Sequence, residues 1–166
     1  MLSQKQIKFR DGFLSPVKQK LFYSKNLPMG LICGIKLVHL DEEKSVAEVP
    51  FRWWNKNPFN SMYFAVQSMA AELSTAAPAM MALKGFDEDI AFIIVELRAE
   101  FIKKAQSKIT FSCLDYNEYY KAISKLKTPE DTATVIVKTV GRDSDDNEVA
   151  TFYCTWSFKI RSKKIK

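Results

Sequence analysis

One segment of the chain has the spacing of a long buried helix, and it constrains the fold more than any other feature. Its apolar side chains recur at steps of three and four residues, which is the repeat of one helix face. They are Met62, Val66, Met69, Leu73, Ala76 and Met80. Alanines fill most positions between them, and a helix that is apolar nearly all round is buried. We expect Asn60 or Ser61 to cap its start and Pro78 to kink or end it.

The rest of the chain has mainly strand patterns. The expected strands span residues 29–41, 45–51, 92–101, 108–116, 132–141 and 149–160, with a short helical stretch at 118–126. Within residues 1–28 the apolar spacing predicts one short amphipathic helix. This order predicts an α+β fold in which an antiparallel sheet wraps around one long central helix. A doubly wound parallel sheet is excluded, because helices do not alternate with the strands.

Length and composition indicate one globular domain. The chain has 166 residues, of which 47% are hydrophobic and 27% charged. We divide it into a helical extension at residues 1–28, the main body, and a basic tail at residues 162–166. The formal net charge is +6, but most of that excess lies in the last eight residues. A basic nucleic-acid binder is therefore only a third hypothesis, because no aromatic-basic recognition motif accompanies the charge.

The cysteines and the start of the chain bear on the cell compartment. Cys33, Cys113 and Cys154 are odd in number and widely spaced, which predicts reduced thiols in a cytoplasmic protein. No metal site is expected, because there is no CxxC pair and His39 is the only histidine. The polar start lacks an apolar signal-peptide core, and no apolar run is long enough to predict a transmembrane helix.

The residues NPFNSMYFAVQSMAAE resemble the helix start of hot-dog acyl-CoA thioesterases. More narrowly, they resemble the phenylacetate-pathway type and a neighbouring branch described as a domain of unknown function. The family pattern is an Asn, a Gly three residues later, a His-Gly-Gly triplet, and an acid nine positions after the His. Asn57, Asn60, the triplet at 63–65 and Glu72 occupy these places in register, and FIKKA at 101–105 is similar to the family's strand-end motif.

This resemblance covers roughly residues 31–161 and implies the hot-dog fold, a homodimer with sites at its interface, and an acyl-CoA or acyl-carrier thioester as substrate. A tetramer is left open. Coenzyme A would then be part of the substrate, and no cofactor is expected. Lys103 and Lys104 stand at the place of a family Arg and could meet the phosphates of coenzyme A. The other expected substrate-binding residues are Tyr63, Asn60, Ser68 and Thr75.

Glu72 is the candidate acid–base group, since it is the only charged residue between Lys56 and Lys84. Burial there would raise the pKa of its carboxyl, as a general base working near neutral pH needs. The backbone N–H of Phe64 or Ala65, at a helix start, could stabilise an oxyanion. Asn57 could orient the water or the carbonyl group.

Each of these residues also has a purely structural interpretation. Glu72 could be a structural carboxylate, Asn57 a turn residue, and Tyr63 and Phe64 the lining of a core or pocket. The lysine pair could be a solvated strand end.

Spacing adds a geometric condition. Nine residues make two and a half helical turns, so Tyr63 and Glu72 point to opposite faces and lie about 13 Å apart. One helix cannot bring both to the same thioester, so a site that uses both needs two chains. The first hypothesis is an acyl-CoA thioesterase-like enzyme with its site at a dimer interface. The alternative is a non-catalytic protein that binds acyl-CoA or another fatty-acyl ligand.

Overall fold

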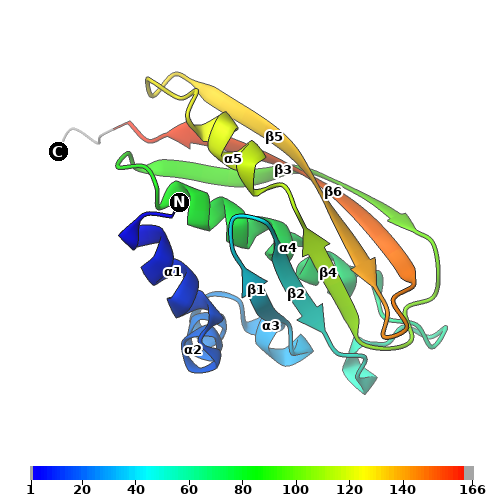
Figure 1. Ribbon diagram of the computed structural model, residues 1–166. Coiled ribbons are helices and arrows are strands. Elements are labelled where there is room, and N and C mark those ends of the chain that lie inside the picture. Colours follow the sequence, from blue (N-terminus) through cyan, green and yellow to red (C-terminus); the bar gives the residue numbers. More distant parts are fainter. Residues whose placement is uncertain (1, 163–166) are drawn as a thin grey trace.

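The computed structural model describes residues 2–162, which build one antiparallel sheet around one long helix (Figure 1). The sheet has six strands in the order β1-β2-β4-β5-β6-β3. They are β1 Lys36–Leu40, β2 Ser45–Val49, β3 Ile90–Phe101, β4 Ile109–Cys113, β5 Thr132–Arg142 and β6 Glu148–Ile160. The predicted α+β architecture is confirmed. Of the predicted basic tail, residues 163–166 lie outside the described residues.

Helix α4 (Phe64–Leu83) is the predicted central helix, and the inner face of the sheet packs on it. Its N-cap is Tyr63, three residues after Asn60 and two after Ser61, the predicted caps. Of the two predicted effects of Pro78, a kink or an end, the end is wrong, because the helix continues to Leu83. Met81 and Ala82 beyond Pro78 are fully buried, and their packing outweighs the loss of one backbone hydrogen bond, which costs about 3 kcal/mol.

The N-terminal prediction needs two corrections. Instead of one helix, three are present, α1 (Gln4–Leu14), α2 (Pro16–Asn26) and α3 (Pro28–Cys33), gathered beside β1 and α4 (Figure 1). The first half of the expected strand at 29–41 is helix α3. Pro28 opens that helix at a position where a missing N–H costs nothing, and Gly34 closes it in the left-handed conformation with φ +73°.

Aromatic side chains from β4, β6 and α5 (Tyr116–Ile123) form the core against α4. Phe111, Phe152 and Phe158 are fully buried. Two polar groups reach Thr75 on α4 through this apolar layer. The hydroxyl of Tyr119 donates to the backbone oxygen of Thr75 at 2.7 Å, and the indole N–H of Trp156 donates to the Thr75 hydroxyl at 3.1 Å. The core therefore fixes the rotation of α4 with hydrogen bonds as well as with packing.

The three cysteines are buried and form no disulfide, which agrees with the prediction of reduced thiols. Within residues 2–162, no helix is long and apolar enough to cross a bilayer.

The packing of Gly141 gives a stability prediction with a built-in control. A Cβ added there would lie 2.5 Å from Phe111 Cε1, and that ring is fully buried. We expect Gly141→Ala to lower the free energy of unfolding by about 1–3 kcal/mol through overpacking.

Gly12 in α1 has open space where its Cβ would go, so Gly12→Ala should be neutral or raise stability by up to about 1 kcal/mol. Urea unfolding of both variants would measure this. Equal effects at the two glycines would contradict the packing described here.

Candidate functional site

The loop before α4 is built by its own polar side chains. The side-chain oxygen of Asn57 accepts hydrogen bonds from the backbone N–H groups of Phe59 at 3.0 Å and Ser61 at 3.1 Å. Asn60 has φ 54°, a left-handed conformation that asparagine tolerates better than most residues. It occupies the position of the family's glycine, which is the other residue suited to that conformation. Asn57 therefore has the turn-forming role that was its alternative interpretation.

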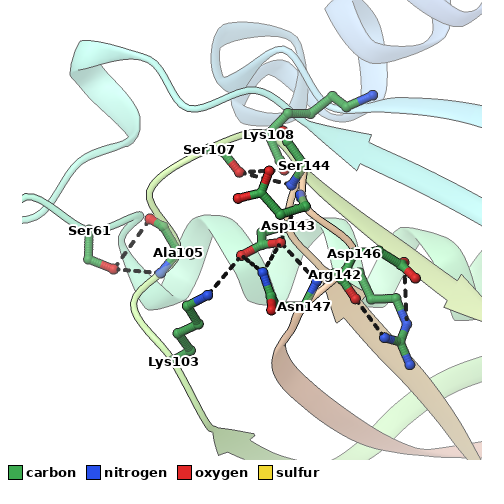
Figure 2. A network of polar contacts seen from close by, with 11 residues as sticks. Ser61, Lys103, Ala105, Ser107, Lys108, Arg142, Asp143, Ser144, Asp146 and Asn147 are labelled. Carbon is green, nitrogen blue, oxygen red and sulfur yellow. Dashed lines mark hydrogen bonds and ion pairs between the residues drawn. The ribbon is translucent and has the colours of Figure 1, made fainter.

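A second segment, just after β3, holds this loop in place. The Ser61 hydroxyl accepts from the backbone N–H of Ala105 at 3.1 Å and contacts its carbonyl oxygen at 3.4 Å, as Figure 2 shows. The N–H of Met62 donates to the same carbonyl at 2.7 Å. Ala105 and Met62 are buried, so these bonds are shielded from water. The two motifs on which the family resemblance rests are thus joined in space.

Between the two segments lies an open cavity of about 530 Å³. It brings together five of the predicted site residues, namely Asn57, Tyr63, Phe64, Lys103 and Lys104. Phe59, Phe101 and Ile102 supply apolar walls. The rings of Tyr63 and Phe64 meet edge to face, with their centroids 4.8 Å apart. The remaining predicted residues, Asn60, Ala65, Ser68, Glu72 and Thr75, do not line this cavity.

The start of α4 offers hydrogen-bond donors beside this cavity. The N–H groups of Val66 and Gln67 donate to the carbonyl of Tyr63 at 3.0 and 3.2 Å. The N–H groups of Phe64 and Ala65 have no acceptor among residues 2–162, and no side chain caps this helix. Unpaired N–H groups at a helix start carry partial positive charge and can stabilise a developing anion.

Gln67 is a site residue that the sequence predictions missed. Its side chain is 4% exposed and lines the cavity. The amide nitrogen donates to the carbonyl of Met62 at 3.2 Å, whereas the amide oxygen is buried with no partner in the described part of the chain. An unsatisfied buried acceptor is costly and marks a place where a ligand group or water can bind. The available signal was a polar residue one turn into an otherwise apolar helix.

The two lysines at the mouth of the cavity differ. The Lys103 ammonium lies 3.5 Å from a carboxylate oxygen of Asp143 (Figure 2). Burial alone would raise the pKa of Asp143, but hydrogen bonds from Asn147 and Asp145, together with the Lys103 charge, lower it, so the carboxylate stays charged. Lys104 forms no ion pair within residues 2–162. A bound phosphate would therefore have to compete with Asp143 for Lys103 and would find Lys104 available.

Ser68 and Thr75 use their hydroxyl groups within the protein. The Ser68 hydroxyl donates to the carbonyl of Phe64 at 2.9 Å, one turn back on α4. Thr75 is fully buried, and its hydroxyl donates to the carbonyl of Glu72 at 2.9 Å while it accepts from Trp156. In this structure Thr75 contributes to the core, and the predicted substrate contact would require it to leave these bonds.

Glu72 lies on α4 outside the cavity, about two turns beyond Phe64 at the helix start. Its side chain is half-buried, and it forms no ion pair or side-chain hydrogen bond with any residue in 2–162. Burial raises the pKa of its carboxyl above the usual value. The expectation from sequence that this acid would be desolvated therefore agrees with its surroundings.

The N-terminal extension lies beside this carboxylate. Burial raises the pKa of Tyr23 on α2 and that of Cys154 on β6; the Leu37 backbone and the Thr75 side chain, respectively, oppose this rise, and the charge of Glu72 adds a smaller increase to both. Both side chains are buried, and Tyr23 is only 2% exposed. The surroundings of Glu72 thus include one residue from the extension and one from the sheet, a placement that sequence spacing does not reveal.

The raised pKa of Glu72 predicts a specific pH dependence of stability. The folded state holds this proton more tightly than the unfolded chain, so the contribution of Glu72 to stability is present at low pH. It is lost as the pH rises from about 4 through the raised folded pKa. Glu72→Gln keeps a neutral side chain at every pH. Its melting temperature should exceed that of the wild type at pH 8, and the gap should shrink towards pH 4. Thermal melts across this range, with the exposed helical Glu118→Gln as control, would measure it, and a gap that widens towards low pH would contradict the assignment.

Taken together, α4 carries its candidate site residues in two separate places. The cavity at the start of α4 has donors, an unpartnered amide oxygen and two lysines, but no acid lines it. The unpartnered carboxylate of Glu72 is eight residues further along, which is about 12 Å of helix. A single chain therefore holds the donors and the carboxylate apart, as the spacing predicted for Tyr63 and Glu72.

No family model and no curated protein matches this sequence. Solved structures do match in shape. A Chlorobaculum tepidum protein of unknown function superposes with TM-score 0.74 at 13% identity, over 90% of this chain and 99% of that chain. A Pseudomonas aeruginosa protein described as a probable thioesterase gives TM-score 0.71 at 18% identity, over 90% and 99%. A thioesterase from Haemophilus influenzae gives TM-score 0.65 at 12% identity, over 92% and 95%.

At these identities the likeness concerns the fold. It agrees with the strand order, with the antiparallel pairing and with the single helix that the sheet encloses. The chain has the hot-dog fold that these thioesterase structures share.

Proposed function

We propose that this protein hydrolyses acyl thioesters, at a site that two copies of the chain build together. The observation that carries the proposal is the division of α4 between unpaired donors at its start and an unpartnered, half-buried carboxylate two turns later. Thioester hydrolysis needs both: a base or nucleophile at the carbonyl carbon, and donors at the oxygen where negative charge develops.

In the proposed mechanism, the N–H groups of Phe64 and Ala65 bind the thioester carbonyl oxygen. Glu72 of the second chain removes a proton from a water molecule as that water attacks the carbonyl carbon. The resulting oxyanion collapses, the carbon–sulfur bond breaks, and the thiolate leaves and takes up a proton. Glu72 could instead attack directly and form an anhydride that water then hydrolyses. The raised pKa of Glu72 suits the first route, because it makes the carboxylate a stronger base.

The other lining residues fit the two ends of such a substrate. The amide nitrogen of Asn57 has no partner within residues 2–162 and can orient the water or the carbonyl group. Lys104, and Lys103 in competition with Asp143, can meet phosphates of a coenzyme A or acyl-carrier group. Coenzyme A would enter as part of the substrate, and the mechanism requires no further cofactor.

The outer edge of β3 supports the pairing of two copies. This twelve-residue strand ends the sheet, so one row of its backbone groups has no strand partner within residues 2–162. Ile93, Val95, Leu97 and Phe101 along it are 45–63% exposed. A long apolar edge strand left open is an aggregation hazard, which natural proteins cover or pair. Antiparallel pairing with a second β3 would cover it and produce two equivalent sites per dimer.

Two solved structures of a Staphylococcus aureus protein, one of them described as a thioesterase, add support. They are variants in which a glutamate or a glutamine is replaced by alanine, at positions fifteen residues apart. Asn57 and Glu72 have the same separation in this chain. The superposition has TM-score 0.60 at 12% identity, over 80% of this chain. An amide at the helix entrance and an acid on the helix, at this spacing, are consistent with a shared arrangement.

One observation favours a second candidate, a protein that binds a fatty-acyl ligand without cleaving it. The rings of Tyr63 and Phe64 line the cavity where the family pattern has a histidine and a glycine, and the Phe64 ring can restrict the approach of a thioester to the helix start. Apolar walls from Phe59, Phe101 and Ile102 would still hold an acyl chain.

A panel of acyl-CoA thioesters of different chain lengths would test the proposal. Release of free thiol by the wild type, well above release by Glu72→Ala, would support hydrolysis. Saturable binding of the same thioesters, with no release above the Glu72→Ala level, would reject hydrolysis and select the binding protein. Neither release nor binding would reject both.

A further inference from the structure

A second cavity, of about 520 Å³, lies between α2, α3 and β1. It shares no lining residue with the cavity at the start of α4. Its volume falls within the range of small-molecule sites. Any ligand it takes would therefore bind apart from the donors at the start of α4, while Tyr23 in its lining is close enough to Glu72 to feel its charge.

The charge of this second cavity has one sign. Lys20, Lys36 and Arg52 line it, no acidic residue does, and none of the three forms an ion pair within residues 2–162. The stretch from residue 12 to residue 40 contains four lysines and no acid. Glu48 lies opposite Lys36 in the sheet, but Lys108 binds its carboxylate at 2.8 Å. The three cations are therefore available to an anion.

Arg52 is held in place by packing and not by an acid. The left-handed Gly34 lets the guanidinium lie directly over the backbone, since a Cβ at Gly34 would be 2.9 Å from Arg52 Nη1. The Trp54 ring lies beside it, with the guanidinium carbon 6.0 Å from the ring centroid. A positioned but unpaired guanidinium is a typical anion-binding group.

Apart from Gln19, whose amide nitrogen donates to the carbonyls of Phe13 and Leu37, and Tyr23, the rest of the lining is apolar. Leu31, Ile35 and Val38 form a hydrophobic wall. Tyr23 also lines the cavity, is 2% exposed, and has a buried hydroxyl with no hydrogen-bond partner in the described part of the chain. A ligand with one polar end and one apolar end would match the cations, the wall and this unpaired hydroxyl.

We propose that this second cavity binds a single-chain anionic amphiphile, whose carboxylate or phosphate head pairs with Lys20, Lys36 and Arg52 while its chain packs on Leu31, Ile35 and Val38. The proposal does not depend on hydrolysis at α4, because the two cavities are separate. Long-chain carboxylates and alkyl phosphates share the required chemistry, and a vesicle surface presents the same head groups without a free chain.

Titration calorimetry with laurate and with dodecyl phosphate, both below their critical micelle concentrations, tests the proposal. We expect saturable binding of one amphiphile per chain, and an increase in Kd of at least about tenfold in Lys36→Gln/Arg52→Gln. Lys127→Gln/Lys138→Gln removes the same charge from exposed positions elsewhere and should change Kd by less than about twofold. All four side chains are exposed, so both double variants should fold, which circular dichroism would check.

Four further measurements, with dodecanol, with anionic vesicles, and with the variants Val38→Asp and Phe64→Trp, distinguish between ligand sources and between the two cavities. Dodecanol should bind far more weakly than dodecyl phosphate, because it lacks the charge. Val38→Asp should weaken binding of both anions, because it places an acid in the wall. The proposal is overturned if only anionic vesicles bind, if both double variants lose affinity equally, or if Phe64→Trp, in the other cavity, abolishes binding while Lys36→Gln/Arg52→Gln does not.

Discussion

Glu72→Gln is expected to lower kcat/KM for an acyl-CoA thioester by about 10²–10⁴-fold, the contribution of a positioned general base. Glutamine keeps the size and hydrogen-bonding capacity of the side chain but cannot accept a proton. The carboxylate forms no ion pair within residues 2–162, so its replacement breaks no salt bridge. At neutral pH the variant should be at least as stable as the wild type, since it no longer buries a charge.

Two comparisons make this result specific. Glu118→Gln changes another helical glutamate, exposed and 2.7 Å from Lys121, and should leave kcat/KM within about twofold. The acid limb of the wild-type pH–rate profile should lie above the usual glutamate pKa and disappear in Glu72→Gln, because burial raises the pKa of this carboxyl. A fully active Glu72→Gln variant would remove Glu72 from the mechanism.

Leu97→Lys should convert the protein into an inactive monomer. Leu97 lies near the middle of β3 and is 45% exposed. If two β3 edges pair about a two-fold axis, the new ammonium group of one chain would face the same ammonium group of the second chain. Like charges brought together at an interface cost several kcal/mol, which is at least about a hundredfold in the dimer Kd. Activity should fall to the level of Glu72→Gln, because each site would lose its second chain.

Ile136→Lys is the matched control for this edge. Ile136 is 67% exposed, on β5, a strand with a neighbour on each side. A lysine there adds the same charge to the surface of the sheet without touching its edge. Sedimentation velocity and thiol release should show wild-type behaviour for Ile136→Lys. A dimeric Leu97→Lys variant with full activity would contradict pairing through β3.

The long helix and the alternating strands could be predicted from sequence because their signals are local. The stripe from Met62 to Met80 and the alternation ending at Phe101 each lie within one element. Residues 29–33 were predicted to be part of a strand, because a short apolar stretch fits a strand or a helix equally well. Its deciding features are Pro28 and Gly34, the residues that begin and end α3.

The candidate site was only partly predictable for a different reason. Glu72 could be identified because it is the single charge in an apolar segment. Gln67 could not, because its importance depends on an amide oxygen that tertiary packing leaves without a partner. The second cavity combines Lys20, Lys36 and Arg52 from three separate segments, so no motif spacing could have revealed it.

Mixing two variants shows most directly whether the donors and the carboxylate of one site come from different chains. Phe64→Pro removes one donor at a helix position that tolerates proline, as Pro16 and Pro28 do in α2 and α3. Alone, Phe64→Pro and Glu72→Gln should each be nearly inactive.

After subunit exchange at equal concentrations, half of the dimers should carry one of each chain, and one of their two sites would be intact. About one quarter of wild-type thiol release should therefore return in this mixture. Activity that stays at the average of the two separate variants, although exchange is complete, would show that each chain builds its site alone.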